Sequence, residues 1–282
     1  MTVAAESTTE RIGPYRVLYE LGRGGMGVVY RAVREDGGPE VALKVPSEEM
    51  SLLFGSVRRE IHALGRLRHP GVVRIIDEGV EQGVPWYAME LLDGLSLEHV
   101  LNIHGAALEA TADLRSVQAN YGGYSRAAEA KPRVRPDLHR ALTLMHRLAR
   151  VLAYVHSRGL VHRDLKPQNV LVRTGDQPVL VDFGLVGHQA MTGREVLEVG
   201  GRAFGTLTYI SPEQARGELV DARADLYSFG VMLYEIVTGR PPFEGNGIMD
   251  LLNMHLNDRP AAPSLLVRDA PPVLEELILT LL

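Results

Sequence analysis

The segment LVHRDLKPQNVLV, residues 160–172, places six polar or charged residues within a run of eight, with apolar residues on both sides. Asp164 supplies a carboxylate, which can accept a proton from a hydroxyl group as a general base. Lys166 supplies a charge that can neutralise a phosphoryl group in transit, and Asn169 supplies an amide oxygen that suits a hard cation such as Mg²⁺. The segment therefore predicts a half-buried site for a hydroxyl, a phosphate and a metal. His162 is expected to be a packed, hydrogen-bonded histidine rather than an acid–base group.

A second carboxylate, Asp182, follows an apolar run in VLVDFGLV, residues 179–186. Magnesium in proteins is usually held by one or two carboxylates together with substrate phosphates, so Asp182 is a candidate ligand. Turns also favour Asp and Gly, so an ordinary turn explains this motif equally well.

A glycine-rich segment, LGRGGMGVVY, lies at residues 21–30 between two strand-like runs and contains Gly22, Gly24 and Gly27. Glycines let a turn approach a phosphate closely and offer it backbone N–H groups, although a flexible hairpin is the plainer interpretation. A dinucleotide-binding loop is excluded because GVVYRAV continues as a strand where a helix would be needed. A Walker loop is excluded because Gly-Lys-Ser/Thr is absent.

Lys44 ends the apolar strand-like run VALK. A lysine on an edge strand would extend towards water. A lysine that points into a cleft would instead need a carboxylate partner, and Glu60 on the helical stripe that follows is the candidate. Glu48 and Glu49 are nearer in sequence but precede that helical pattern.

The elements that must position these residues change in character near Gly94. Residues 1–12 show no pattern and are expected to be disordered. Strand-like runs then follow, interrupted by a helical stripe at about residues 50–67. Beyond Gly94 the pattern is mainly helical, with three helices expected: one capped by Ser96 and running to about Ile103, a long one between Asp137 and Gly159, and a buried one at residues 221–238.

Bulk composition limits the classes of protein that fit. The chain has 282 residues, a net charge of −5 and no cysteine. The mild negative charge argues against a general nucleic-acid binder, and the lack of cysteine excludes disulfides and thiolate zinc sites. The start of the chain has no apolar run, so no secretory signal is expected. No stretch approaches the roughly 18 apolar residues of a membrane span.

Together these motifs resemble the eukaryotic-type protein kinase family. The order matches: Gly-rich loop, VALK, helical glutamate, HRDLKPQN, DFG, then SPEQ at residues 211–214 in place of the usual Ala-Pro-Glu. The segments FGTLTYISPEQARG and DARADLYSFGVMLYEIVTGRPPF look like the serine/threonine kinases of bacteria, and the resemblance runs from about Tyr15 to the last residue. It implies an α+β, bilobal protein-kinase-like fold, with a β-rich N-lobe containing one helix and a larger, mainly helical C-lobe.

The resemblance also implies domain boundaries. After the disordered lead, a kinase domain would occupy residues 13–282, divided into an N-lobe (13–89), a hinge (90–94) and a C-lobe (95–282). Residues 105–136 would be an insertion where the family has a brief link. The family normally continues with another helix and an arginine that pairs with the glutamate found here as Glu213, so the domain is expected to be incomplete at its C-terminal end.

Roles for single residues follow from the same resemblance. Lys44 would contact the α- and β-phosphates of ATP and pair with Glu60, Asp164 would accept the substrate hydroxyl proton, and Lys166 would touch the γ-phosphate. Leu64, His162 and Phe183 would stack as an apolar column. Two residues would hold Mg²⁺, for which Mn²⁺ could substitute: Asn169 and Asp182. The nucleotide would be bound by Leu21, Gly22, Gly24, Gly27, Val29, Ala42, Lys44, the gatekeeper Met89, the backbone of Glu90 and Leu92, and Leu171.

The resemblance implies an ATP-dependent protein serine/threonine kinase whose partners are ATP and proteins carrying Ser or Thr. Self-phosphorylation would fall on Thr192, and Glu198 could partly replace a phosphate by pairing with Arg163. No nucleic acid and no membrane segment is expected within this chain, and the catalytic domain would be cytoplasmic even if missing sequence anchors the parent protein to a membrane. Two alternatives stay open: a pseudokinase that serves as a nucleotide-binding scaffold, and a kinase of small molecules on a similar fold.

Overall fold

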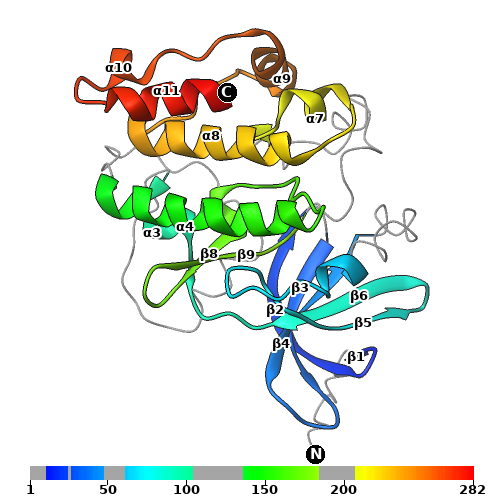
Figure 1. Cartoon of the computed structure of the whole chain (residues 1–282). Helices are drawn as coiled ribbons and strands as arrows, with labels where there is room; N and C mark the ends of the chain where they lie inside the picture. The colour runs from blue at the N-terminus through cyan, green and yellow to red at the C-terminus, as the bar shows by residue number, and fades with distance from the viewer. Residues whose placement is uncertain (1–10, 25–26, 48–60, 104–135, 184–206) are drawn as a thin grey trace, which may run out of the picture. The chain divides into compact units, whose positions relative to one another are not determined.

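The computed structural model describes residues 11–24, 27–47, 61–103, 136–183 and 207–282 (Figure 1). The chain forms two compact units. Of the described residues, unit 1 contains 11–24, 27–47, 61–66 and 74–91, and unit 2 contains 67–73, 92–103, 136–183 and 207–282. The boundary at residues 91 and 92 falls inside the segment predicted as a hinge.

Unit 1 is built on an antiparallel sheet, as the strand-like runs predicted. Its strand order is β1-β2-β3-β4-β6-β5. The strands are β1 (Arg11–Ile12), β2 (Tyr15–Gly24), β3 (Gly27–Arg34), β4 (Glu40–Pro46), β5 (Ile75–Glu81) and β6 (Val84–Glu90). Arg11 and Ile12 correct the expectation of a disordered lead over residues 1–12, because they pair with Arg16 and Tyr15 of β2. Residues 1–10 lie outside the described ranges.

One face of this sheet carries a hydrophobic core. Its buried members are Tyr15, Ala32, Val41, Leu43, Trp86 and Ala88. The rings of Tyr15 and Trp86 meet edge to face, with 5.6 Å between their centroids. Gly79 permits this packing, since a Cβ at that position would lie 2.3 Å from the Trp86 ring. Of the helix expected at about residues 50–67, residues 61–64 are helical and the part before them is not described.

Unit 2 is mainly helical, as expected for the chain beyond Gly94. Its helices are α3 (Leu97–Val100), α4 (Leu138–Ser157), η3 (Pro167–Asn169), α7 (Pro212–Arg216), α8 (Ala222–Thr238), α9 (Ile248–Asn257), α10 (Pro263–Leu266) and α11 (Pro272–Leu281). A small sheet has the order β7-β8-β9, formed by β7 (Leu95–Ser96), β8 (Val170–Arg173) and β9 (Gln177–Leu180). None of the helices in the described ranges is long and apolar enough to cross a membrane.

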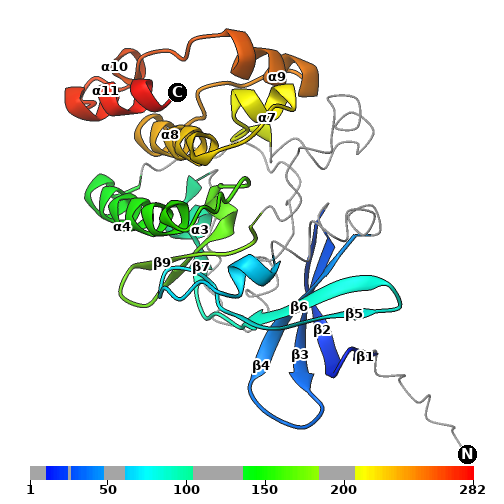
Figure 2. The same ribbon diagram turned by 45° about the vertical axis from the view of Figure 1, so that its right-hand side comes forward.

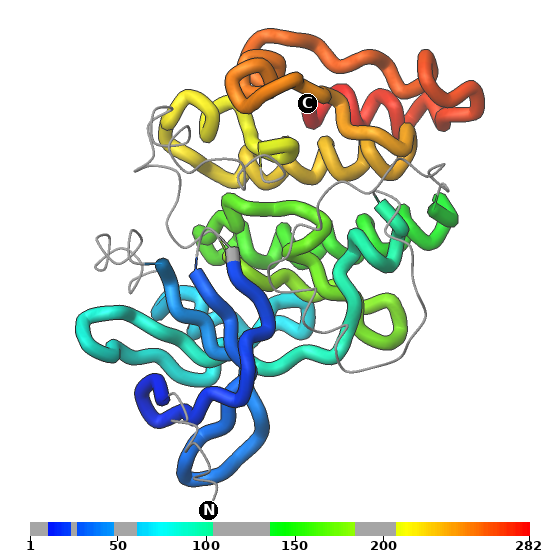
Figure 3. Tube along the Cα trace, turned by 180° about the vertical axis from the view of Figure 1, so that it is seen from behind, coloured from blue at the N-terminus to red at the C-terminus, as the bar shows by residue number. Residues whose placement is uncertain are grey.

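The helices of unit 2 form layers around α8. Helices α10 and α11 pack on α8, α8 packs on α4, and α4 packs on β9 (Figures 1 and 2). Seen from behind, β8 and β9 form a hairpin against α4 (Figure 3). The central position of α8 explains its composition, because helix residues buried on nearly all sides must be apolar or internally bonded.

Local signals set the ends of these helices where the sequence predicted them. The side chain of Asp137 accepts hydrogen bonds from the first backbone N–H groups of α4, and Gly159 follows the helix in a left-handed conformation with φ +73°. Asp221 caps α8 in the same way. Ser96 caps α3, but that helix ends at Val100 rather than near Ile103, because Asn102 turns left-handed with φ +50°.

Candidate active site

The loop that follows α4 is held by a buried carboxylate from α8. Asp225 is 1% exposed, and its Oδ2 accepts a hydrogen bond from the backbone N–H of His162 at 2.8 Å. Its Oδ1 accepts from the N–H of Arg163 at 2.8 Å, and Nε2 of His156 lies 2.7 Å from Oδ2. Arg163 has a left-handed backbone, φ +65°, which costs free energy in a non-glycine residue. The bonds to Asp225 therefore fix a loop conformation that the chain would not adopt alone.

The structure brings the three predicted residues Asp164, Lys166 and Asn169 together at this loop. Oδ2 of Asp164 accepts from Nζ of Lys166 at 2.9 Å and from Nδ2 of Asn169 at 2.8 Å. Nδ2 of Asn169 also donates to the carbonyl of Asp164 at 2.8 Å. All three side chains are largely buried. A carboxylate acts as a general base only when ionised, and a bonded ammonium group favours that form.

Asn169 turns its amide nitrogen towards Asp164, where two acceptors fix its orientation. The amide oxygen therefore points away from Asp164 and is the atom of this residue that suits a cation. The backbone carbonyl of Asn169 accepts from the N–H of Val181 at 3.0 Å, next to Asp182. The two predicted metal ligands are thus tied through adjacent backbone positions.

Asp182 follows β9 with a left-handed backbone, φ +54°. Its neighbours are fixed by His162, which is fully buried: Nε2 of His162 lies 3.0 Å from the carbonyl of Val181, and its ring stands 4.5 Å from that of Phe183. Burial lowers the pKa of His162, so this ring is neutral near pH 7. The expectation of a packed, hydrogen-bonded histidine is confirmed.

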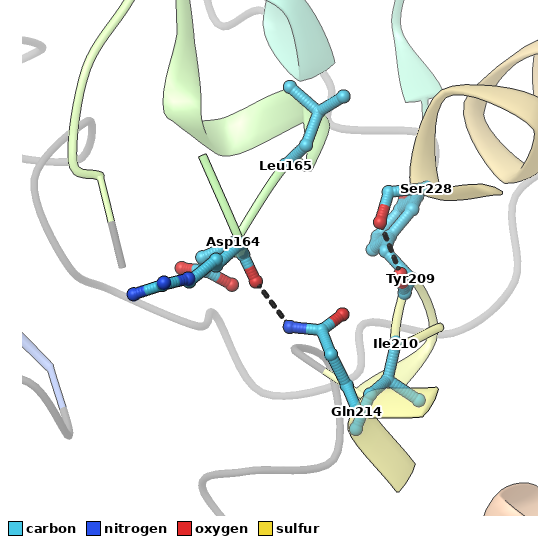
Figure 4. A pocket seen from close by; sticks show the side chains of 7 residues that line it. Asp164, Leu165, Tyr209, Ile210, Gln214 and Ser228 are labelled. Carbon is cyan, nitrogen blue, oxygen red and sulfur yellow. Dashed lines mark hydrogen bonds between the residues drawn. The ribbon is translucent and has the colours of Figure 1, made fainter. Parts of the chain in front are cut away.

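A small pocket lies beside Asp164 (Figure 4). It is lined by Arg163, Asp164, Leu165, Tyr209, Ile210, Gln214 and Ser228. Ser228 of α8 donates from its hydroxyl to the carbonyl of Tyr209 at 2.7 Å, and Nε2 of Gln214 donates to the carbonyl of Arg163 at 2.7 Å. The segment before α7 and the loop before Asp164 are thereby both fixed by side chains.

Two residues of this site, Asp225 and Gln214, had no role assigned from the sequence, although sequence features pointed to both. Asp225 is a carboxylate inside an apolar helix, and a buried charge requires partners. Gln214 stands three residues after Ser211, the spacing of a capping box. The buried carboxylate and the capping-box spacing both indicate buried polar contacts. Neither feature identifies the distant segment that supplies the hydrogen-bond partner.

In unit 1, four of the predicted nucleotide residues share one face of the sheet. Val29 and Lys44 stand opposite each other, as do Ala42 and Met89. Because directly opposed residues point the same way and positions two apart on a strand do too, all four lie on the face away from the hydrophobic core. Lys44 is 4% exposed and is therefore not an edge lysine extending into water. The strand that continues after Gly27 confirms the exclusion of a dinucleotide-binding loop.

Other predicted residues are placed as follows. Leu21 is buried, Gly22 stands opposite Val29, and Gly24 opposite Gly27, whose φ of +131° only glycine adopts readily. Glu90 ends β6, stands opposite Val41, and donates its N–H to the carbonyl of Arg74 at 2.9 Å. In unit 2, Leu92 and Leu171 are buried. Outside the described residues lie Glu60, Thr192, Glu198 and nearly all of the insertion at 105–136.

Comparisons with known proteins agree with this architecture. The Protein kinase domain family matches residues 15–277. The kinase domain of PknI from Mycobacterium tuberculosis, a cysteine-to-alanine variant, has a similar fold with a TM-score of 0.65, 24% identity, and coverage of 98% of this chain and 91% of that one. The α+β kinase fold is thus confirmed.

Curated relatives are bacterial serine/threonine-protein kinases. Pkn2 of Myxococcus xanthus is 37% identical over 92% of this chain and 28% of its own length. The DNA damage-responsive kinase RqkA of Deinococcus radiodurans is 37% identical over 96% and 36%, and PknD of Mycobacterium tuberculosis is 33% identical over 99% and 38%. The chain thus spans about a third of the length of these relatives. With a kinase domain matched over most of its length, the chain belongs to the protein kinase family.

Proposed function

We propose that this chain is a protein serine/threonine kinase that transfers the γ-phosphoryl group of Mg-ATP to serine and threonine hydroxyls of protein substrates. The observation that carries the proposal is the bonded cluster of Asp164, Lys166 and Asn169 on a loop fixed by Asp225. Phosphoryl transfer needs positioning and charge stabilisation more than covalent chemistry, and this cluster offers both. The names of the relatives support a serine/threonine kinase.

In this proposal Asp164 orients the attacking hydroxyl and accepts its proton. Nζ of Lys166 stays within 2.9 Å of the carboxylate and supplies positive charge to the phosphoryl group as it leaves ATP. Nδ2 of Asn169 holds Asp164 from the other side, so the base does not need to reorganise during transfer.

Asn169 and Asp182 would hold Mg²⁺ through oxygen atoms, and Mn²⁺ would fit the same hard donors. The metal would neutralise charge on the phosphates. Within the described residues, no group of three or more His, Asp or Glu side chains is placed to form a complete protein cage for a metal. Two protein ligands, Asn169 and Asp182, are enough for Mg²⁺, which usually keeps waters and substrate phosphates in its coordination shell.

The nucleotide itself would bind to the face of unit 1 that carries Val29, Ala42, Lys44 and Met89. In the proposal, Lys44 pairs with Glu60 and contacts the phosphates. A pseudokinase usually lacks the lysine, the base or the metal aspartate, and this chain retains all three, so no observation favours a scaffold function.

The direct test is transfer of labelled phosphate from ATP. We expect the protein to label a generic Ser/Thr peptide and not the matching Tyr peptide, with the activity abolished by EDTA and restored by Mg²⁺. ATP binding without transfer to any protein or peptide would refute the proposal and favour a scaffold. Self-phosphorylation at Thr192 belongs to the same proposal. Mass spectrometry before and after incubation with Mg-ATP checks it, and a Thr192→Ala variant should lose that phosphate.

A further inference from the structure

Two buried side chains from different helices hold the backbone of Arg163. Asp225 of α8 accepts from its N–H at 2.8 Å. Gln214 of α7 donates from Nε2 to its carbonyl at 2.7 Å (Figure 4). That carbonyl belongs to the peptide that joins Arg163 to Asp164, so the bond from Gln214 acts one peptide away from the base.

The side-chain amide of Gln214 takes part in two interactions, the capping box of α7 and the hydrogen bond to Arg163. Its Oε1 accepts from the N–H of Ser211 at 3.2 Å, and its own N–H donates to the Ser211 hydroxyl at 3.4 Å, which completes the capping box of α7. Its Nε2 is then directed at Arg163. Gln214 is 5% exposed, so both bonds are largely shielded from bulk water.

We propose that Gln214 is a positioning residue for phosphoryl transfer: through the carbonyl of Arg163 it sets the orientation of the Asp164 carboxylate. The left-handed backbone of Arg163, φ +65°, needs external bonds to persist. If the carbonyl of Arg163 loses its donor, the peptide can rotate and Asp164 turns with it. The inference rests on the proposed kinase function, because it assigns a supporting group to that reaction.

A simpler role, in which Gln214 only caps α7, makes a different demand on the side chain. A capping box is formed equally well by Glu, since only the acceptor oxygen is needed to bond the N-cap N–H. The bond to Arg163 needs the amide N–H, which Glu lacks. Gln214→Glu therefore keeps the cap and replaces the donor by an oxygen that faces the carbonyl of Arg163.

The experiment compares Gln214→Glu with Ser211→Ala in the full chain. Ser211→Ala removes the hydroxyl of the cap but leaves the amide of Gln214 and its bond to Arg163. We expect Gln214→Glu to lower kcat for a Ser/Thr peptide by about 10- to 100-fold, as small misplacements of a reacting group do, with KM for ATP within about two-fold. Ser211→Ala should lower Tm while kcat per folded protein stays within about three-fold. Gln214→Met, which loses both bonds, should combine the two effects.

A second measurement does not depend on activity. Hydrogen exchange of the backbone amides in residues 163–166 should speed up about ten-fold or more in Gln214→Glu and stay unchanged in Ser211→Ala. The proposal is overturned if Gln214→Glu keeps kcat within three-fold of the wild type, or if Ser211→Ala loses as much. If the wild-type protein transfers no phosphate, the proposed function fails instead. In that case the hydrogen-exchange rates of residues 163–166 alone test the inference. Equal rates in Gln214→Glu and Ser211→Ala would overturn it.

Discussion

Replacing Asp225 by asparagine would test how much this single carboxylate contributes to the stability and conformation of the loop that follows α4. The change keeps the shape of the side chain but removes its charge and turns one acceptor into a donor. Asp225 now accepts from the N–H of His162, from the N–H of Arg163 and from the ring of His156. An asparagine oxygen can occupy only one of the two oxygen positions, so its NH₂ group must face at least one buried donor.

The magnitude follows from these bonds. A hydrogen bond to a charged group contributes about 1.5–3 kcal/mol, and leaving a buried donor unpaired costs about 1–3 kcal/mol. We expect Asp225→Asn to lower the free energy of unfolding by about 2–4 kcal/mol, and Tm by about 5–15 °C for a protein of this size. Without its anchor, Arg163 can relieve backbone strain of about 1–3 kcal/mol, which displaces Asp164. We therefore also expect kcat to fall more than about ten-fold at temperatures where the variant is folded.

The assay combines thermal and urea denaturation with peptide phosphorylation at 20 °C. Glu218→Gln is the matched control, because it makes the same change of charge at an exposed site. An Asp225→Asn variant that melts and turns over like the control would show that the three bonds do not fix the loop. Lost stability with full activity at 20 °C would separate anchoring from catalysis and refute the second half of the reasoning.

Asp164→Asn should lower phosphoryl transfer by about 10²–10⁴ while ATP affinity stays within about two-fold, since the general base is lost; turnover near the wild-type rate would point to another base. Lys44→Met should remove activity with a small change in Tm, because the lysine lies on the face of the sheet away from the hydrophobic core; a collapse of Tm together with activity would indicate a structural lysine instead. Burial lowers the pKa of His255 to about 4, below the value of about 6.5 in an unfolded chain, so a proton favours the unfolded state. The stabilising effect of the neutral ring is complete above about pH 6.5 and is lost as pH falls towards 4. His255→Gln should make the free energy of unfolding less dependent on pH in that range; a pH dependence equal to that of the wild type in urea titrations would refute this.

The sequence predicted the features of this chain that depend on near neighbours. The ends of α4 followed from Asp137 and from Gly159, because capping involves residues within one turn. The grouping of Asp164 with Asn169 could be expected for the same reason, since the two lie five positions apart in the sequence. These contacts form wherever the local backbone is right.

Contacts between residues far apart in the chain could not be predicted from the sequence. The bond from Arg163 to Asp225 joins residues 62 apart, and that from Gln214 to Arg163 joins residues 51 apart. No local pattern identifies such partners, although a carboxylate in an apolar helix shows that a partner must exist. Strand β1 was missed for a related reason: two residues are too few to show a period, and their pairing with β2 decides the conformation.

The distance in sequence between the loop and its anchor has a consequence for synthesis of the protein. A ribosome delivers residues in order, so a growing chain contains Asp164 long before α8 supplies Asp225. During that interval the backbone of Arg163 has no carboxylate to hold its left-handed conformation. On the proposed mechanism we therefore expect catalytic competence to require a folded α8, so that a nascent chain carrying every residue of the HRDLKPQN segment but not α8 would be inactive.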